Sequence, residues 1–184
     1  MNCIACLGWG SLTWDPRDLL IEPEWFKDGP LIKVEFVRQS NDGRITLTLE
    51  PNSDYVPSLW AKMQTNKIDE AIESLRSREG ISNKYQERDI GIWKEGEASP
   101  ELIYRLSEWA GAKGITNLIW TNLSPKFNKI DKTPTVEEVI EYLTNLTGDT
   151  RNAAETYIRN APIQINTAYR REIEYILGRK VMIT

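Results

Sequence analysis

The chain has 184 residues, no histidine, and a formal net charge of −4 from 23 Lys and Arg against 27 Asp and Glu. This length suits a single domain over residues 1–184, and the weak acidity argues against a nucleic-acid partner, which would require a basic face. The lack of histidine excludes Ser-His and Cys-His catalytic arrangements and imidazole metal ligands. Any enzyme built on this sequence must therefore use carboxylates, hydroxyls, lysines or backbone amides.

The N-terminal segment bears on location and on redox chemistry. Met1–Leu12 lacks the basic and apolar regions of a signal peptide, and no stretch of the sequence is long enough for a membrane-spanning helix. We therefore expect a cytoplasmic protein with no membrane partner. Cys3 and Cys6 form a C-x-x-C pair, but zinc would need further Cys or His ligands that the sequence lacks. A redox pair should open a helix, whereas Cys3–Leu7 predicts a short buried strand with inert thiols.

Strands dominate the N-terminal half. Apolar and polar residues alternate at Ile32–Phe36 and Ile45–Leu49, which is the period of a half-buried strand. Asp42-Gly43 between them supplies the positive φ that a hairpin turn needs. Further strands are expected at Val56–Met63, Asp89–Lys94 and Ile115–Thr121.

Helices are predicted from capping residues and apolar spacing. One begins at Asp69 and ends at Gly80, and a second begins at Ser99-Pro100 and ends near Gly111 or Gly114. Thr135-x-x-Glu138 is a capping box that opens a mostly helical C-terminal addition over about 133–178, with later helices at Ala153–Asn160 and Thr167–Gly178. Strands come first and helices later, so the expected class is α+β with a mixed, largely antiparallel sheet.

A glycine-rich loop, Gly8-Trp9-Gly10-Ser11-Leu12, directly follows the first strand. Glycines allow a tight turn in which successive amides form a concave anion site, with a serine hydroxyl as a further donor. Dinucleotide binding would need glycine at position 13, which is Thr13, and the lysine of a Walker A loop is absent. Two interpretations stay open: a carboxylate-binding cradle, and a structural turn packed by Trp9 and Trp14.

Glu79 stands on the apolar face of its predicted helix. Ile68, Ile72 and Leu75 form one stripe, and Glu79 continues it four residues beyond Leu75. An inward carboxylate is costly unless it is paired or used, and a general base is one such use. The alternatives are that the helix frays before Glu79, or that Glu79 pairs with Arg76 or Arg78.

Together these features resemble the γ-glutamylcyclotransferase superfamily. Gly8–Trp14 is similar to the Tyr-Gly-Ser loop of the family, and its Gly-Ser-Leu-x-Trp form is closest to the glutathione-directed ChaC branch. Val56–Ala61 and Arg78-Glu79-Gly80 resemble the family's Trp-containing strand and Glu-Gly pair in order and spacing. Phe36–Ser40 is similar to the Arg- and Ser-terminated strand of the ChaC branch, and Tyr169–Gly178 weakly resembles the closing segment. The resemblance covers about residues 3 to 95 and is that of a divergent member of the superfamily.

The resemblance implies a fold in which the sheet curls into a small barrel with helices packed around it. It implies release of 5-oxoproline from a γ-glutamyl amino acid, peptide such as glutathione, or amine, with no metal and no cofactor. Glu79 would be catalytic as base and then acid. The Gly8–Leu12 loop would bind the substrate, with amides of Gly10, Ser11 and Leu12 on the α-carboxylate. Arg38 would hold a carboxylate or the oxyanion, unless it is a surface arginine at a strand end.

Two departures from the family leave another function open. Trp9 stands where the family has tyrosine, and the stretch from Thr133 to Pro162 has no counterpart in the motifs. The same scaffold could therefore be a non-catalytic module that binds a small molecule, or a protein-interaction domain that uses Arg170-Arg171. The leaving group and the oligomeric state are not determined by the sequence.

Overall fold

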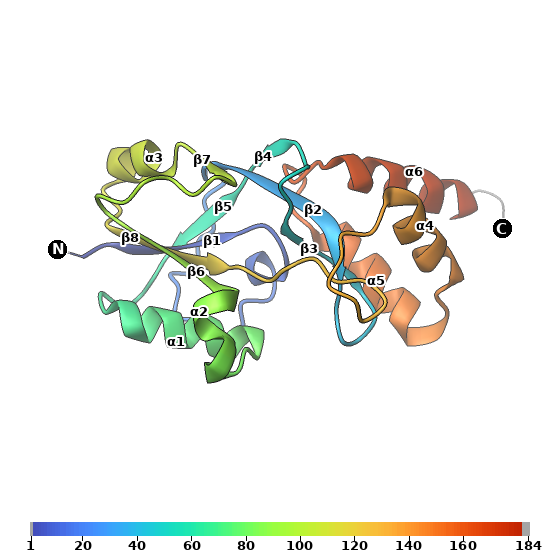
Figure 1. The fold of residues 1–184 in the computed structure, drawn as a ribbon, viewed down its shortest axis with the longest axis horizontal. Helices are drawn as coiled ribbons and strands as arrows, with labels where there is room; N and C mark the ends of the chain where they lie inside the picture. Colours follow the sequence, from blue (N-terminus) through green and yellow to red (C-terminus); the bar gives the residue numbers. More distant parts are fainter. Residues whose placement is uncertain (1, 182–184) are drawn as a thin grey trace. The chain divides into compact units, whose positions relative to one another are not determined.

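The computed structural model describes residues 2–181 and forms a mixed α+β fold with two sheets and helices α1–α6 (Figure 1). The chain divides into two compact units. Unit 1 contains the chain up to Ile32 together with Pro57–Leu123, and unit 2 contains Lys33–Val56 and the chain from Ser124 onward. The α+β class is confirmed. The single domain with a helical addition stays a prediction.

The sheet of unit 1 contains four strands in the order β5 (Leu59–Lys62), β1 (Ile4–Gly8), β8 (Asn117–Thr121) and β6 (Ile90–Lys94). β1 runs parallel to β8, whereas the β1–β5 and β6–β8 pairs are antiparallel. Every residue of β1 is buried, as expected for a strand with apolar cover on both faces. Strands β1, β6 and β8 confirm the strands predicted at Cys3–Leu7, Asp89–Lys94 and Ile115–Thr121, with bounds that differ by two residues at most.

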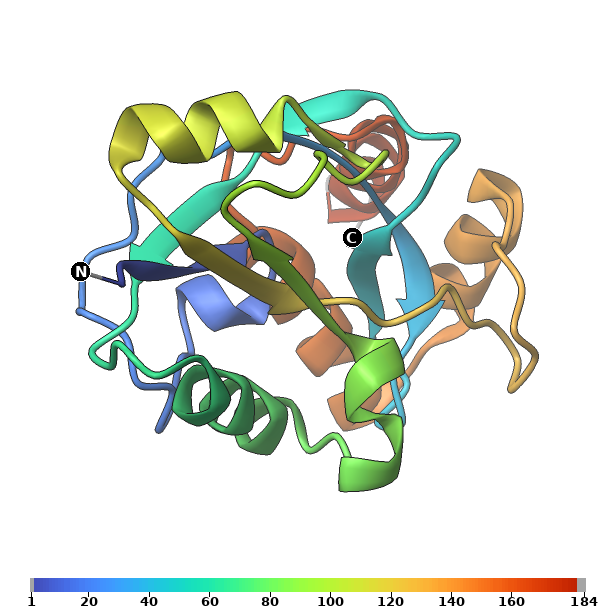
Figure 2. The same cartoon turned by 60° about the vertical axis from the view of Figure 1, so that its left-hand side comes forward.

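Two helices cover opposite faces of this sheet (Figure 2). On one face, the stripe of α1 (Ile68–Glu79) packs Ile72 and Leu75 into one core cluster with Cys6 of β1. On the other face, Trp109 of α3 (Leu106–Lys113) meets the Trp60 ring edge-on at 5.6 Å. The loop between α1 and β6 contains the short helices η2 (Asn83–Tyr85) and α2 (Gln86–Asp89).

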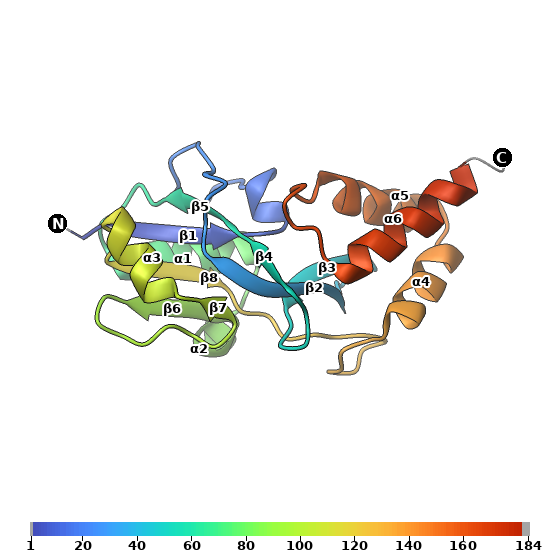
Figure 3. The same ribbon diagram turned by 90° about the horizontal axis from the view of Figure 1, so that it is seen from above.

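Unit 2 contains most of the second sheet, where β2 (Leu31–Gln39) lies between β3 (Ile45–Leu49) and β4 (Tyr55–Pro57). The predicted β2–β3 hairpin is confirmed, with Gly43 at φ 84° in its turn. Helices α4 (Val136–Asn145), α5 (Gly148–Asn160) and α6 (Ala168–Val181) gather beside these strands (Figure 3). The capping box at Thr135 and Glu138 is confirmed. Among the described residues, no helix combines the length and apolar character needed to cross a bilayer.

Three predictions about elements were wrong in detail. Val56–Met63 is not one strand, because Ser58 turns its amide and its hydroxyl to the Pro30 carbonyl and separates β4 from β5. The helix expected from Ser99 begins only at Leu106, because Ile103 pairs with Ile32 of β2 in the short strand β7 (Ile103–Tyr104). Helix α5 begins at Gly148, five residues before the helix predicted from Ala153.

The expected barrel also differs. Within residues 2–181, strand pairing produces two sheets, and neither strand order closes on itself. The turn at Ser58 separates β4 from β5, so these residues do not form the single continuous strand that was expected.

Candidate active site

The glycine loop turns its apolar side chains inward. Trp9 and Leu12 are each 5% exposed. Gly8 ends β1 against Trp25, and a Cβ at this position would stand 2.5 Å from Cζ3 of the Trp25 ring. Because the side chains are in the core, the backbone is the part of the loop that is available to a ligand. This arrangement contains elements of both interpretations, the packed turn and the cradle.

The backbone of the loop has unused donors. Residues Ser11–Thr13 form the short 3-10 helix η1, in which the Thr13 amide donates to the Gly10 carbonyl at 3.0 Å. Among the described residues, the amides of Gly10, Ser11 and Leu12 donate to no protein acceptor. Gly10 is buried, and a buried amide without a partner is costly. These three amides are the donors that the sequence analysis assigned to an anion cradle, and that role stays a prediction.

Glu79 is held in position by the end of its helix. Gly80 adopts the left-handed conformation, and the Ile81 amide donates to the Arg76 carbonyl at 3.0 Å, so α1 does not fray before Glu79. The Glu79 side chain is 16% exposed, as its place on the apolar stripe predicted. Its Oε1 accepts a hydrogen bond from Nη1 of Arg78 at 2.8 Å. Glu79 therefore points inward and is also paired with Arg78, so these two interpretations of the sequence are compatible.

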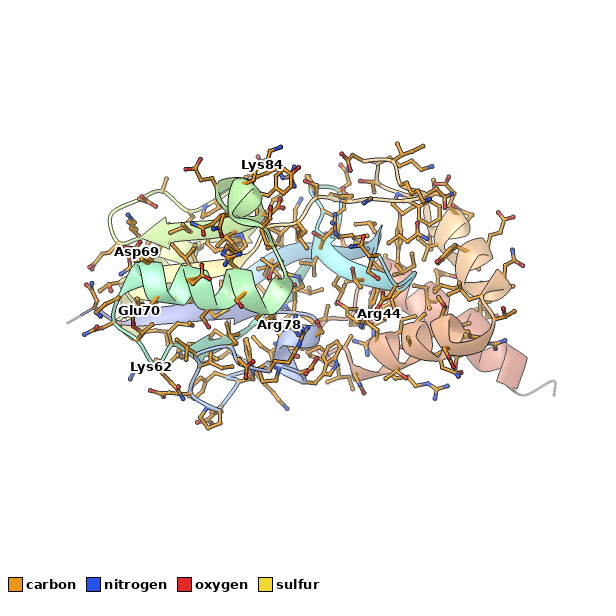
Figure 4. The ribbon with its side chains drawn as sticks, turned by 90° about the horizontal axis from the view of Figure 1, so that it is seen from below. Arg44, Lys62, Asp69, Glu70, Arg78 and Lys84 are labelled. Atoms are coloured by element: carbon orange, nitrogen blue, oxygen red, sulfur yellow. The ribbon has the colours of Figure 1, made fainter. Side chains whose placement is uncertain are left out.

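Arg78 connects this acid to the glycine loop. Its side chain is 2% exposed, and Nη2 donates to Ser11 Oγ at 3.1 Å and to the Asp15 carbonyl at 2.6 Å. Figure 4 shows Arg78 at the C-terminal end of α1. Sequence reasoning named Arg78 only as a possible partner of Glu79. The signal was present, because Arg78 lies three residues after Leu75 and so also continues the apolar stripe.

Cys6 lies next to this ion pair from the side of β1. The pKa of its thiol is raised, mainly by complete burial and further by the negative charge of Glu79, while the positive charge of Arg78 lowers it. The thiol is therefore protonated at neutral pH. Both cysteines are free, and Cys3 is half-buried. A protonated, buried Cys6 is the inert thiol that the sequence predicted.

Arg38 lies in unit 2, on β2. Its Nη1 donates to the Ser124 carbonyl, and its own carbonyl accepts a hydrogen bond from the Thr46 hydroxyl at 3.1 Å. Its role in binding a carboxylate stays a prediction.

A separate open cleft of about 640 Å³ lies in unit 1, at the N-terminal end of α1. Its charged side chains compensate one another, since Lys67 pairs with Glu70 at 2.7 Å and Lys62 pairs with Glu22 at 3.3 Å. Figure 4 shows Lys62 and Glu70 at the opposite end of α1 from Arg78. We do not assign this cleft to the candidate active site.

Comparison with known proteins identifies the fold. No family model and no curated protein matches the sequence. The crystal structure of a yeast γ-glutamyl cyclotransferase specific to glutathione matches with a TM-score of 0.51 over 97% of this chain and 99% of that chain. The fold is γ-glutamylcyclotransferase-like. At 14% sequence identity, the likeness establishes the fold alone, and because it covers 97% of the chain it extends past residue 95, where the resemblance in motifs ends.

Proposed function

We propose that this protein is a γ-glutamyl cyclotransferase, which releases 5-oxoproline from a γ-glutamyl amino acid, peptide or amine. One observation supports this function above the others. A mostly buried acid, Glu79, is joined through Arg78 to a loop with three unpartnered amides, within a γ-glutamylcyclotransferase-like fold.

The reaction is an intramolecular aminolysis that needs only an acid–base group and a well-placed substrate. Glu79 takes a proton from the substrate α-ammonium, and the free amine attacks the γ-carbonyl carbon of the same glutamyl group. The tetrahedral intermediate collapses, the bond to the leaving amine breaks, and the leaving nitrogen receives the proton from Glu79. The ring nitrogen then gives up its second proton, which the released amine takes up to leave as its ammonium, so that the product is the neutral lactam. Bringing the two reacting groups together can supply roughly 7–11 kcal/mol of the barrier reduction. The reactant, the two products and the proton balance without a further reagent.

The amides of Gly10, Ser11 and Leu12 would hold the α-carboxylate of the substrate, with Gly8 and Trp9 supporting the backbone from the core side. Backbone donors suit this role because they are fixed before the substrate arrives. The role of Arg38 in holding a carboxylate or the oxyanion stays a prediction, and an unchanged KM and kcat in an Arg38→Ala variant would reject it.

Glutathione is the first substrate to test, because the structural neighbour is specific to it. The purified chain is incubated with glutathione, with other γ-glutamyl amino acids and with γ-glutamyl amines, and 5-oxoproline is measured by mass spectrometry. We expect 5-oxoproline from at least one substrate class, in amounts equal to the released amine. No 5-oxoproline from any of them would reject the cyclotransferase. The cytoplasmic location stays a prediction.

A non-catalytic module that binds a γ-glutamyl compound is the second candidate. Trp9, a buried tryptophan where the resemblance expects tyrosine, favours it. A thermal shift caused by glutathione, together with no product, would support this alternative.

A further inference from the structure

Arg78 carries a charged side chain that is almost completely buried. An arginine side chain that is 2% exposed is rare and is costly unless its charge is compensated. Its position in the last turn of α1 provides part of the compensation, because the negative end of the helix dipole favours a cation there. Glu79 provides a full negative charge at 2.8 Å, and the Asp15 carboxylate lies 4.0 Å from Nη2.

The hydrogen bonds of this guanidinium are divided between the two parts of the site. Nη1 binds one oxygen of Glu79, whereas Nη2 binds the Ser11 hydroxyl and the Asp15 carbonyl. Asp15 in turn donates its amide to the Ser11 carbonyl at 2.8 Å, which closes the turn after the glycine loop. In the part of the chain that the structure describes, no group donates to the other oxygen of Glu79, Oε2.

We propose that Arg78 is the positioning residue of the active site. It holds Oε1 of Glu79, so that Oε2 is the oxygen left to exchange a proton with the substrate, and it locks the amide-bearing loop through Ser11 and Asp15. This inference rests on the proposed function and adds a role that neither the motifs nor the fold assigns. Arg78 keeps its charge throughout the reaction, because a guanidinium does not release its proton in proteins. It touches Glu79 and the loop rather than the substrate.

The planar fork of arginine is essential to this role. Its two terminal nitrogens reach Glu79 and Ser11 at the same time in a fixed geometry, whereas a lysine ammonium is a single point charge on a flexible stem. Lysine at position 78 would thus keep a positive charge near Glu79 and lose the connection to the loop. The two functions of Arg78 can be separated by comparing Arg78→Lys with Arg78→Gln.

Kinetics with the best substrate tests the catalytic part. For Arg78→Gln we expect kcat to fall about 10²-fold or more because Glu79 loses its fixed orientation, and KM to rise because the loop that binds the substrate loosens. Arg78→Lys should retain more of kcat than Arg78→Gln, because the ammonium keeps a positive charge beside Glu79, and should show the same rise in KM, because it loses the loop. Arg76→Gln, another arginine with a glutamate partner on α1, is the matched control and should retain both kcat and KM.

Hydrogen exchange tests the structural part without requiring activity. We expect faster amide exchange over residues 10–15 in Arg78→Gln, Arg78→Lys and Ser11→Ala, and no change there in Arg76→Gln. An Arg78→Gln variant with the original kcat overturns the inference, as does a rate loss that only matches the unfolded fraction. Unchanged loop exchange in Arg78→Lys and Ser11→Ala also overturns it, even if Arg78→Gln does not fold. Failure of the wild-type chain to form 5-oxoproline rejects the proposed function instead, and the exchange result still decides whether Arg78 locks the loop.

Discussion

Replacing Glu79 with glutamine separates its chemistry from its contribution to stability. The amide oxygen of glutamine can still accept the hydrogen bond from Arg78 Nη1, which is 2.8 Å long in the structure. The guanidinium donor stays charged, so that hydrogen bond remains charge-assisted. However, Arg78 is 2% exposed and loses its full negative partner, and removing one member of a buried ion pair costs about 3–5 kcal/mol. Removing a negative charge from the C-terminal turn of α1 offsets about 0.3–1 kcal/mol of this cost. The net loss in the free energy of unfolding should therefore be about 2–4 kcal/mol.

For a chain of this size, about 1 kcal/mol shifts the melting temperature by roughly 2–4 °C, so we expect Glu79→Gln to melt roughly 4–16 °C below the wild type and to stay folded at the assay temperature. Loss of the acid–base group should lower kcat by about 10²–10⁴-fold. The assay is 5-oxoproline formation under saturating substrate, with the melting temperature measured on the same preparation. Glu73→Gln is the matched control, since Glu73 is on the same helix, also pairs with an arginine, and is largely exposed. Equal rates in Glu79→Gln and Glu73→Gln would refute the assignment of Glu79 as the catalytic acid–base group.

Three further predictions concern packing, pH and the thiols. Gly8→Ala should lower the free energy of unfolding by about 1–3 kcal/mol, seen in urea titration, because the new Cβ overlaps the Trp25 ring. Burial raises the pKa of Glu35, although hydrogen bonds to its carboxylate oppose this rise. The contribution of Glu35 to the free energy of unfolding is therefore complete below the ordinary pKa of 4.5 and is lost as the pH rises through the raised pKa. Glu35→Gln should therefore gain stability relative to the wild type as the pH rises above the ordinary pKa of 4.5 in melting scans. Iodoacetamide should alkylate Cys3 and leave Cys6 unmodified in the native protein, because Cys6 is buried and its pKa is raised.

Each of these predictions has a control and a contradicting outcome. Gly111→Ala, with open space around its helical position, should be neutral or stabilising, and an equal loss in both glycine variants would contradict the packing argument. A stability difference between Glu35→Gln and the wild type that is constant with pH would show that burial does not perturb Glu35. Both thiols should react in denaturant, and equal alkylation rates in the native protein would contradict the burial of Cys6.

Local patterns were sufficient for much of the fold. The period of two in β2 and β3, the turn at Asp42-Gly43 and the capping box at Thr135 depend on neighbours within a few residues, so the sequence predicted them correctly. The break between β4 and β5 and the late start of α3 depend on partners elsewhere. Ser58 turns to Pro30, and Ile103 pairs with Ile32, which lies far away in the chain. Propensity at these positions yields to tertiary hydrogen bonds.

The candidate site divides in the same way. The sequence by itself determined that a glycine loop follows the first strand and that an acid occupies the apolar face of α1, because both are features of short segments. Only the tertiary structure decided that Arg78 joins them, since Ser11 and Arg78 are 67 residues apart. A helical period tells which face of α1 is buried, but the packing of the sheet determines which loop meets the end of that helix. For this reason the buried guanidinium, rather than the glutamate, is the feature that required the structure.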